Sequence, residues 1–152
     1  MGVHPLQASS QFAEDAFAFL RPLGFTLQER RVTGGDSFKD GWLLSFVGPK
    51  IEFIVQYMDM QFEVHFVRAD LTVSYREIDR DLFDRRSGFH GDMFPPQKLE
   101  AAISRIAADI DAHYRSILAG DEVQWTRLVR LKAKPREAPR LPGSRRPTRR
   151  CS

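Results

Sequence analysis

Residues 42–76, WLLSFVGPKIEFIVQYMDMQFEVHFVRADLTVSYR, constrain the fold of this chain most strongly, because apolar and polar side chains alternate across three turns. Successive residues of a β-strand point to opposite faces of a sheet. A two-residue turn at Asp59-Met60 would pair Tyr57 with Phe62 and place the apolar rows of both strands on one face. The segment therefore predicts a four-stranded antiparallel meander.

The outer two turns, at Gly48-Pro49 and Arg68-Ala69-Asp70, are expected to keep the same face buried. A slip of one residue at any turn would expose an apolar row to water. In the expected register the cross-strand pairs are Phe46 with Ile51, Leu44 with Phe53, Trp42 with Val55, Phe66 with Leu71, Val64 with Val73 and Phe62 with Tyr75.

The opposite face of the meander is mostly polar, with a few aliphatic side chains mixed in. An antiparallel sheet commonly packs one face on the core and leaves the other in water. Because the core uses the apolar rows, any function of the meander is expected on this second face or in a flanking loop. Its expected members are Glu52, Ile54, Gln56, Met58, Gln61, Glu63, His65, Val67, Thr72, Ser74 and Arg76.

Two amphipathic helices are predicted to flank the meander, at 9–21 and at about 96–119, because apolar residues recur there at three- and four-residue steps. Ser9 or Ser10 is expected to cap the first helix. Residues 25–32 are a candidate for a fifth strand at the sheet edge, where charged side chains discourage pairing with other chains.

Two shorter helices complete the prediction. Residues 77–86 alternate acids and arginines, which is typical of a solvated, salt-bridged helix surface. Residues 121–131 are expected to form the last helix, with Trp125, Leu128 and Val129 facing inward. The predicted fold class is therefore α+β: a two-layer sandwich with helices on one face of a four- or five-stranded antiparallel meander sheet.

The element order, with a Leu23-Gly24-Phe25 break after the first helix, resembles that of small bacterial α+β proteins of the toxin-immunity or uncharacterised type. The resemblance covers roughly residues 9–131. The resemblance lies in the order of helices and strands, and it assigns no function to any residue. An immunity protein would act by occluding a partner toxin or enzyme, which is the function that the resemblance implies.

The excess of basic residues belongs to the C-terminal segment. Residues 132–152 carry a net charge of +7, whereas residues 1–131 carry −4. The segment 132–152 has four prolines and a single large aliphatic residue, too little apolar surface to offset the entropy of ordering, so we expect a disordered tail. Residues 1–131 suit a single domain, whose acidic surface would steer a basic partner.

The compartment is predicted to be the cytoplasm. No run of 18 apolar residues is present to span a membrane, and the first ten residues lack the pattern of a secretory signal. The lone cysteine, Cys151, cannot staple the domain.

Candidate binding residues gather on the second face and in the Gly- and Pro-rich segment 87–95. His65 is expected near Glu63, where a carboxylate beside an imidazole suits acid–base chemistry or plain hydrogen bonding. No nucleophile or oxyanion pattern accompanies this pair, so no catalytic residue is assigned. Aromatic residues in 87–95 either anchor a partner or plug the core. The candidate binding residues are Gln56, Glu63, His65, Arg76, Phe89, His90 and Phe94.

No metal site or cofactor is predicted, since HExxH and His/Cys clusters are missing and His90-Gly91-Asp92 offers only two ligands. The chain is expected to be a protein-interaction module and not an enzyme. Two alternatives stay open. One is a small ligand binder or enzyme that uses the sheet face around His65. The other is association with nucleic acid through the tail residues Arg145, Arg146, Arg149 and Arg150.

Overall fold

A single antiparallel sheet of five strands forms one layer of the protein, in a computed structural model that describes residues 5–33, 41–84 and 93–133. The strands are neighbours in the order of the sequence, so the predicted meander is confirmed. Of the four- and five-stranded alternatives, the five-stranded sheet is the one observed, with its first strand at the sheet edge next to β2. The strands are β1 (Thr26–Thr33), β2 (Gly41–Val47), β3 (Glu52–Met58), β4 (Gln61–Arg68) and β5 (Leu71–Ser74).

The β3–β4 hairpin has the predicted register, with Tyr57 opposite Phe62. Its two turn residues, Asp59 and Met60, both have positive φ, 52° and 68°. Two such residues form the tight turn whose twist matches that of the flanking strands. This hairpin therefore fixes the register at the centre of the sheet.

The other two hairpins keep the predicted face buried, but their predicted registers are wrong by two residues. In the first, the Gly48 amide donates to the Ile51 carbonyl at 2.9 Å, which leaves Pro49 and Lys50 as the turn. A shift of two residues leaves every side chain on its original face, so alternation cannot detect it. The observed pairs include Phe46 with Phe53, Leu44 with Val55, Trp42 with Tyr57 and Phe66 with Val73.

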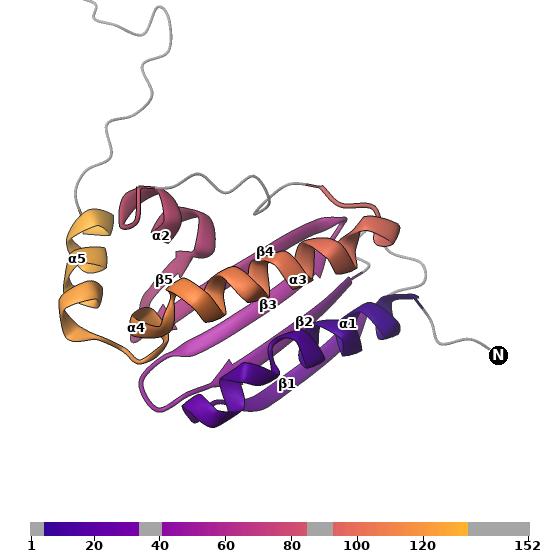
Figure 1. The fold of residues 1–152 in the computed structure, drawn as a ribbon, viewed down its shortest axis with the longest axis horizontal. Coiled ribbons are helices and arrows are strands. Elements are labelled where there is room, and N and C mark those ends of the chain that lie inside the picture. The colour runs from indigo at the N-terminus through magenta and orange to yellow at the C-terminus, as the bar shows by residue number, and fades with distance from the viewer. Residues whose placement is uncertain (1–4, 34–40, 85–92, 134–152) are drawn as a thin grey trace, which may run out of the picture.

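Helices α1 (Pro5–Ala16) and α3 (Pro96–His113) cover one face of the sheet, as Figure 1 shows. The predicted two-layer α+β sandwich is therefore confirmed. The core lies between the layers and is rich in aromatic side chains. Its largest fully buried members include Trp42, Trp125, Tyr114, Phe17, Phe53, Phe62 and Phe66.

The first helix begins earlier than predicted, so Ser9 and Ser10 lie inside α1 and do not cap it. The buried Ser9 hydroxyl instead accepts a hydrogen bond of 2.8 Å from the Trp42 indole. A buried indole N–H needs an acceptor, so this bond fixes α1 against the sheet. The chain continues as the 3-10 helix η1 (Ala18–Leu23). This short helix ends at Gly24, whose φ is 95°.

The long helix also ends earlier than predicted, because α3 stops at His113 and a short helix, α4 (Arg115–Leu118), follows. The last helix, α5 (Glu122–Ala133), has the Asp121 side chain as acceptor for the amides of Val123 and Gln124. Trp125 and Leu128 are buried as predicted. Val129 is 50% exposed, so its predicted inward position is wrong.

The fifth strand stops at Ser74, where helix α2 (Tyr75–Asp81) begins, so the prediction that Arg76 continues the strand is wrong. Ser74 and Glu77 form a capping box: each side chain accepts a hydrogen bond from the other residue's amide. The prediction that the charged residues of 77–86 lie on a solvated helix surface is wrong at Asp79, which is only 2% exposed and accepts a hydrogen bond of 2.9 Å from the Tyr114 hydroxyl.

None of the described helices is both long and apolar enough to cross a membrane. Helices α2, α4 and α5 gather at one end of the sheet, beside β5 (Figure 1). The face opposite α1 and α3 carries no described helix, and this uncovered face holds three of the seven predicted binding residues, Gln56, Glu63 and His65.

Candidate functional site

The uncovered side of the sheet, which we call the open face, consists of alternate residues of β2 to β5. These side chains are half-buried or exposed, whereas the residues between them are buried under the helices. The alternation observed in β2, β3 and β4 follows directly from the two-residue period of a strand. The open face comprises Leu43, Ser45, Val47, Glu52, Ile54, Gln56, Met58, Gln61, Glu63, His65, Val67, Thr72 and Ser74.

Three of the predicted binding residues meet at the centre of the open face. Gln56 and Glu63 are direct cross-strand partners, and the Gln56 amide donates to Glu63 Oε1 at 3.2 Å. The Nε2 atom of His65 lies 3.1 Å from the same oxygen. The side chains of Glu63 and His65 are 28% and 25% exposed. The sheet therefore holds one carboxylate between an amide and an imidazole, in partial contact with water.

Aliphatic side chains surround this polar centre. Leu43 lies directly opposite Gln56, and Ile54 lies directly opposite His65. Both aliphatic side chains are half-buried. Neighbouring side chains on one face of a sheet touch across the strands, so the open face mixes apolar and hydrogen-bonding groups at short range.

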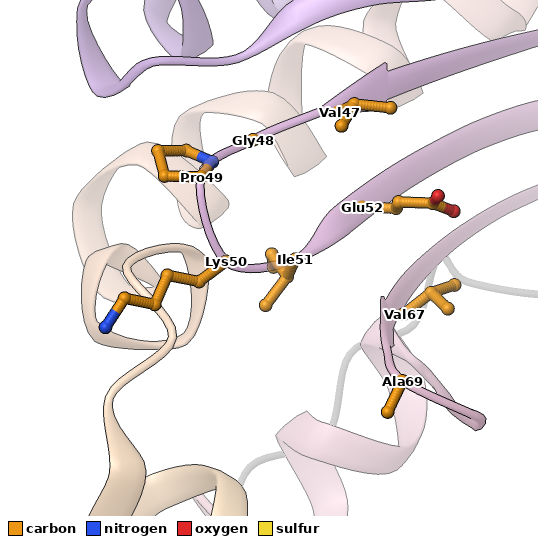
Figure 2. Close-up of a pocket in the computed structure, with 8 residues that line it drawn as sticks. All are labelled: Val47, Gly48, Pro49, Lys50, Ile51, Glu52, Val67 and Ala69. Atoms are coloured by element: carbon orange, nitrogen blue, oxygen red, sulfur yellow. The ribbon is translucent and has the colours of Figure 1, made fainter.

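A pocket of about 350 Å³ lies at one end of the open face, beside the β2–β3 turn (Figure 2). Val47, Glu52 and Val67, which lie in one cross-strand row, contribute its sheet side. The remaining lining residues come from the β2–β3 turn and from Ala69. The alternation of apolar and polar residues places the sheet residues of this pocket on the open face. Only the corrected β2–β3 register, however, makes Val47 the partner of Glu52. This pocket was therefore not predicted from the sequence.

The other predicted binding residues are not part of this arrangement. Arg76 is exposed on α2, beyond the end of β5. Phe94 packs against the hydrophobic core, and its carbonyl accepts a hydrogen bond of 2.6 Å from the Tyr57 hydroxyl. Burial raises the pKa of the Tyr57 phenol, so this group stays a donor. The position of Phe94 fits a core plug.

Several predicted residues lie outside the described part of the chain. These are Phe89 and His90 in the segment 85–92, and Arg145, Arg146, Arg149 and Arg150 in the segment 134–152. Their suggested roles in binding a partner or a nucleic acid remain predictions.

A second group of polar side chains lies at the junction of α2 and α3. Tyr75 donates to a carboxylate oxygen of Asp109, while Tyr114 donates to Asp79. The Tyr114 ring is fully buried and stacks on Phe66 with a centroid separation of 5.6 Å. Because these bonds connect α2 with α3 and with Tyr114 at its end, the second of them inside the core, we assign them a structural role.

Charged groups at the end of α5 pair with α2. Lys132 donates to Glu77 at 2.8 Å, which joins the last helix to the capping box. Burial raises the pKa of the Glu77 carboxyl, but the bonds from Lys132 and from the Ser74 amide outweigh burial and lower it overall. The carboxylate therefore stays ionised and holds both partners.

No group of three or more His, Cys, Asp or Glu side chains in the described segments could hold a metal ion. No protein-family model, curated protein or solved structure matches this chain. The geometry of the open face is therefore the basis on which a function can be proposed.

Proposed function

We propose that the chain is a protein-interaction module that binds a partner protein through the open face. The observation that carries this proposal is the hydrogen-bonded trio of Gln56, Glu63 and His65, set among aliphatic side chains on a sheet surface that no described helix covers. A partner that covers this surface would occlude the trio and its apolar surroundings together.

The aliphatic residues supply the apolar part of such an interface. Burial of apolar surface contributes roughly 25 cal/mol per Å². Leu43, Ile54 and Val67 are half-buried in the free protein and would lose their remaining contact with water under a partner. The rigid backbone of three paired strands presents them without a conformational change, which lowers the entropic cost of binding.

The polar trio supplies specificity. Glu63 accepts from both neighbours, so its orientation is set before a partner arrives. A carboxylate held in this way favours a partner that presents a hydrogen-bond donor or a positive charge at the matching position. The net charge of −4 on residues 1–131 would also speed the encounter with a basic protein. A basic toxin or enzyme in the cytoplasm, occluded in the manner of an immunity protein, is the finer form of this proposal.

The carboxylate–imidazole pair also meets one condition of the ligand-binding or enzymatic alternative, because Glu63 and His65 lie within hydrogen-bond reach. Two observations favour protein binding instead. None of the trio lines the pocket beside the β2–β3 turn. The hydroxyl of Ser74, the cross-strand partner of His65, is already used in a helix cap, because it accepts a hydrogen bond from the Glu77 amide.

Affinity capture from the source cells, with the bound proteins identified by mass spectrometry, tests the proposal. The test variant carries Ile54→Lys and Val67→Lys on the open face. The matched control carries Ala101→Lys and Ala108→Lys, which add the same charge at exposed positions of α3. We expect the control to retain the partner of the wild type and the open-face variant to lose it, with circular dichroism showing that both are folded. Retention by both folded variants would refute binding through the open face.

A further inference from the structure

We infer that the pocket beside the β2–β3 turn binds an amphipathic cation, namely a guanidinium or ammonium group on an aliphatic stem. If the proposed function holds, the natural source of this group is an arginine or lysine side chain of the partner protein. The inference deepens that proposal, because the pocket continues the open face along the row of Val47, Glu52 and Val67.

The apolar part of the pocket suits an aliphatic stem. Figure 2 shows Val47 and Ile51 on one side and Val67 and Ala69 on the other. The volume of about 350 Å³ falls within the range of small-molecule sites, roughly 300–1,000 Å³. Long cationic side chains bury their methylene stems on such surfaces while the charged head stays in water. The pocket therefore has room and walls for the stem.

Glu52 supplies the charge that would select a cation. Its side chain is exposed at the pocket, and it makes no hydrogen bond or ion pair with a residue of the described segments. Val47 and Val67 are its direct cross-strand partners on the two neighbouring strands. A carboxylate between two aliphatic walls matches a ligand that ends an apolar stem with a positive charge.

Lys50 also lines the pocket, but its charge is directed elsewhere. The Lys50 stem packs against the turn between α4 and α5, where a Cβ added at Gly120 would lie only 2.6 Å from Lys50 Cβ. Its charge helps to lower the pKa of the Glu122 carboxyl, for which Arg68 is the main cause. Figure 2 shows the Lys50 amine and the Glu52 carboxylate on opposite sides of the turn. Lys50 therefore does not neutralise Glu52.

The backbone of the turn offers little to an anion. The Gly48 amide already donates to the Ile51 carbonyl at 2.9 Å, and Pro49 has no N–H group. Anion sites in loops are built from several free backbone amides. With Lys50 turned away, the electrostatics of the pocket favour a cation.

A titration of the full chain, followed by the NMR signals of its methyl groups, tests the inference with three small probes. The probes are n-butylguanidinium, the neutral isostere N-butylurea and the anion pentanoate. We expect saturable shifts of the Val47, Val67 and Ala69 methyls with n-butylguanidinium, with a dissociation constant in the millimolar range. The same signals should move less with N-butylurea and least with pentanoate, while the exposed Val129 methyls on α5 stay unchanged.

Two variants assign the charge preference. Glu52→Gln keeps the size of the side chain and should weaken n-butylguanidinium binding by roughly two- to fivefold, as expected for an exposed ion pair. Asp59→Asn removes the same charge from the β3–β4 turn at the other end of β3 and should leave binding unchanged. Equal binding of the guanidinium and the urea, equal binding by wild type and Glu52→Gln, or no methyl shifts at all would overturn the inference.

The two proposals fail separately. If the pocket ignores the cation but the open-face lysine variant still loses its partner, only the pocket inference is wrong. If the cation binds but no partner depends on the open face, the pocket remains a cation site and the proposed function is wrong.

Discussion

The two faces of β3 differ in what covers them, although they share one backbone. On the covered face, Phe53 and Val55 have no exposed surface, because the helical layer packs on them. On the open face, their neighbours Ile54 and Gln56 stay half-buried, with no described helix above them. The packing that stabilises the fold is therefore concentrated on the covered face. The residues of the open face are left available to bind a partner.

The largest test of this comparison replaces one large side chain on each face. Phe53→Ala removes a fully buried ring that contacts Phe17, Phe46 and Phe66, so we expect it to lower the free energy of unfolding by about 3–5 kcal/mol. Ile54→Ala, one residue away, should cost about 1 kcal/mol, because the lost surface is already partly exposed in the native state. Chemical denaturation of both variants measures the difference. Similar losses would show that the open face is covered in the folded chain.

A second test concerns polar groups on the covered side. Tyr114→Phe removes the hydroxyl that donates to Asp79, a carboxylate only 2% exposed, and should cost about 1–3 kcal/mol. Tyr75→Phe is the matched control, since its acceptor Asp109 keeps 21% of its side chain exposed and water can replace the lost donor. Thermal unfolding should show the larger decrease for Tyr114→Phe. A larger effect of Tyr75→Phe would contradict the structural role given to Asp79.

The same comparison explains how far the fold could be predicted from the sequence. The period of two assigned each residue of β3 and β4 to its correct face, because a misassignment would expose a row of aromatic rings. It could not choose between registers that differ by two residues, since both bury the same rows. The tight turn at Asp59-Met60 was predicted correctly, whereas the turn near Pro49 was placed one residue too early.

The candidate site was likewise predicted only in part. Gln56, Glu63 and His65 meet as expected, because cross-strand and same-strand spacing brings them together. Arg76 does not join them, since the capping box at Ser74 turns the chain into a helix. The charge pattern of 77–86 predicted exposure, yet Asp79 is buried because a partner for it, Tyr114, comes from a distant part of the sequence. Contacts of that kind leave no local pattern.

A third test measures how stability depends on pH through Glu77, in the capping box where β5 is followed by α2. The pKa of Glu77 is lowered in the folded protein, so its contribution to stability is fully present above the ordinary pKa of 4.5. That contribution is lost as the pH falls through the lower, folded value. We expect Glu77→Gln to cost about 0.5–1 kcal/mol at neutral pH and almost nothing in strong acid. Urea denaturation at several pH values measures this, and a difference that is constant with pH would contradict it.

The smallest expected effect on stability belongs to the centre of the open face. Glu63→Gln keeps the shape of the side chain and removes the charge that Gln56 and His65 share, so the free energy of unfolding should stay within about 0.5 kcal/mol of wild type. If a partner covers this carboxylate, its capture should fall at least about tenfold, because an unmatched donor is then buried in the interface. Denaturation and quantitative capture on the same preparation separate the two effects. A loss of stability without a loss of the partner would make the trio a structural feature. That result would contradict the distinction between a covered face that stabilises the fold and an open face that binds a partner.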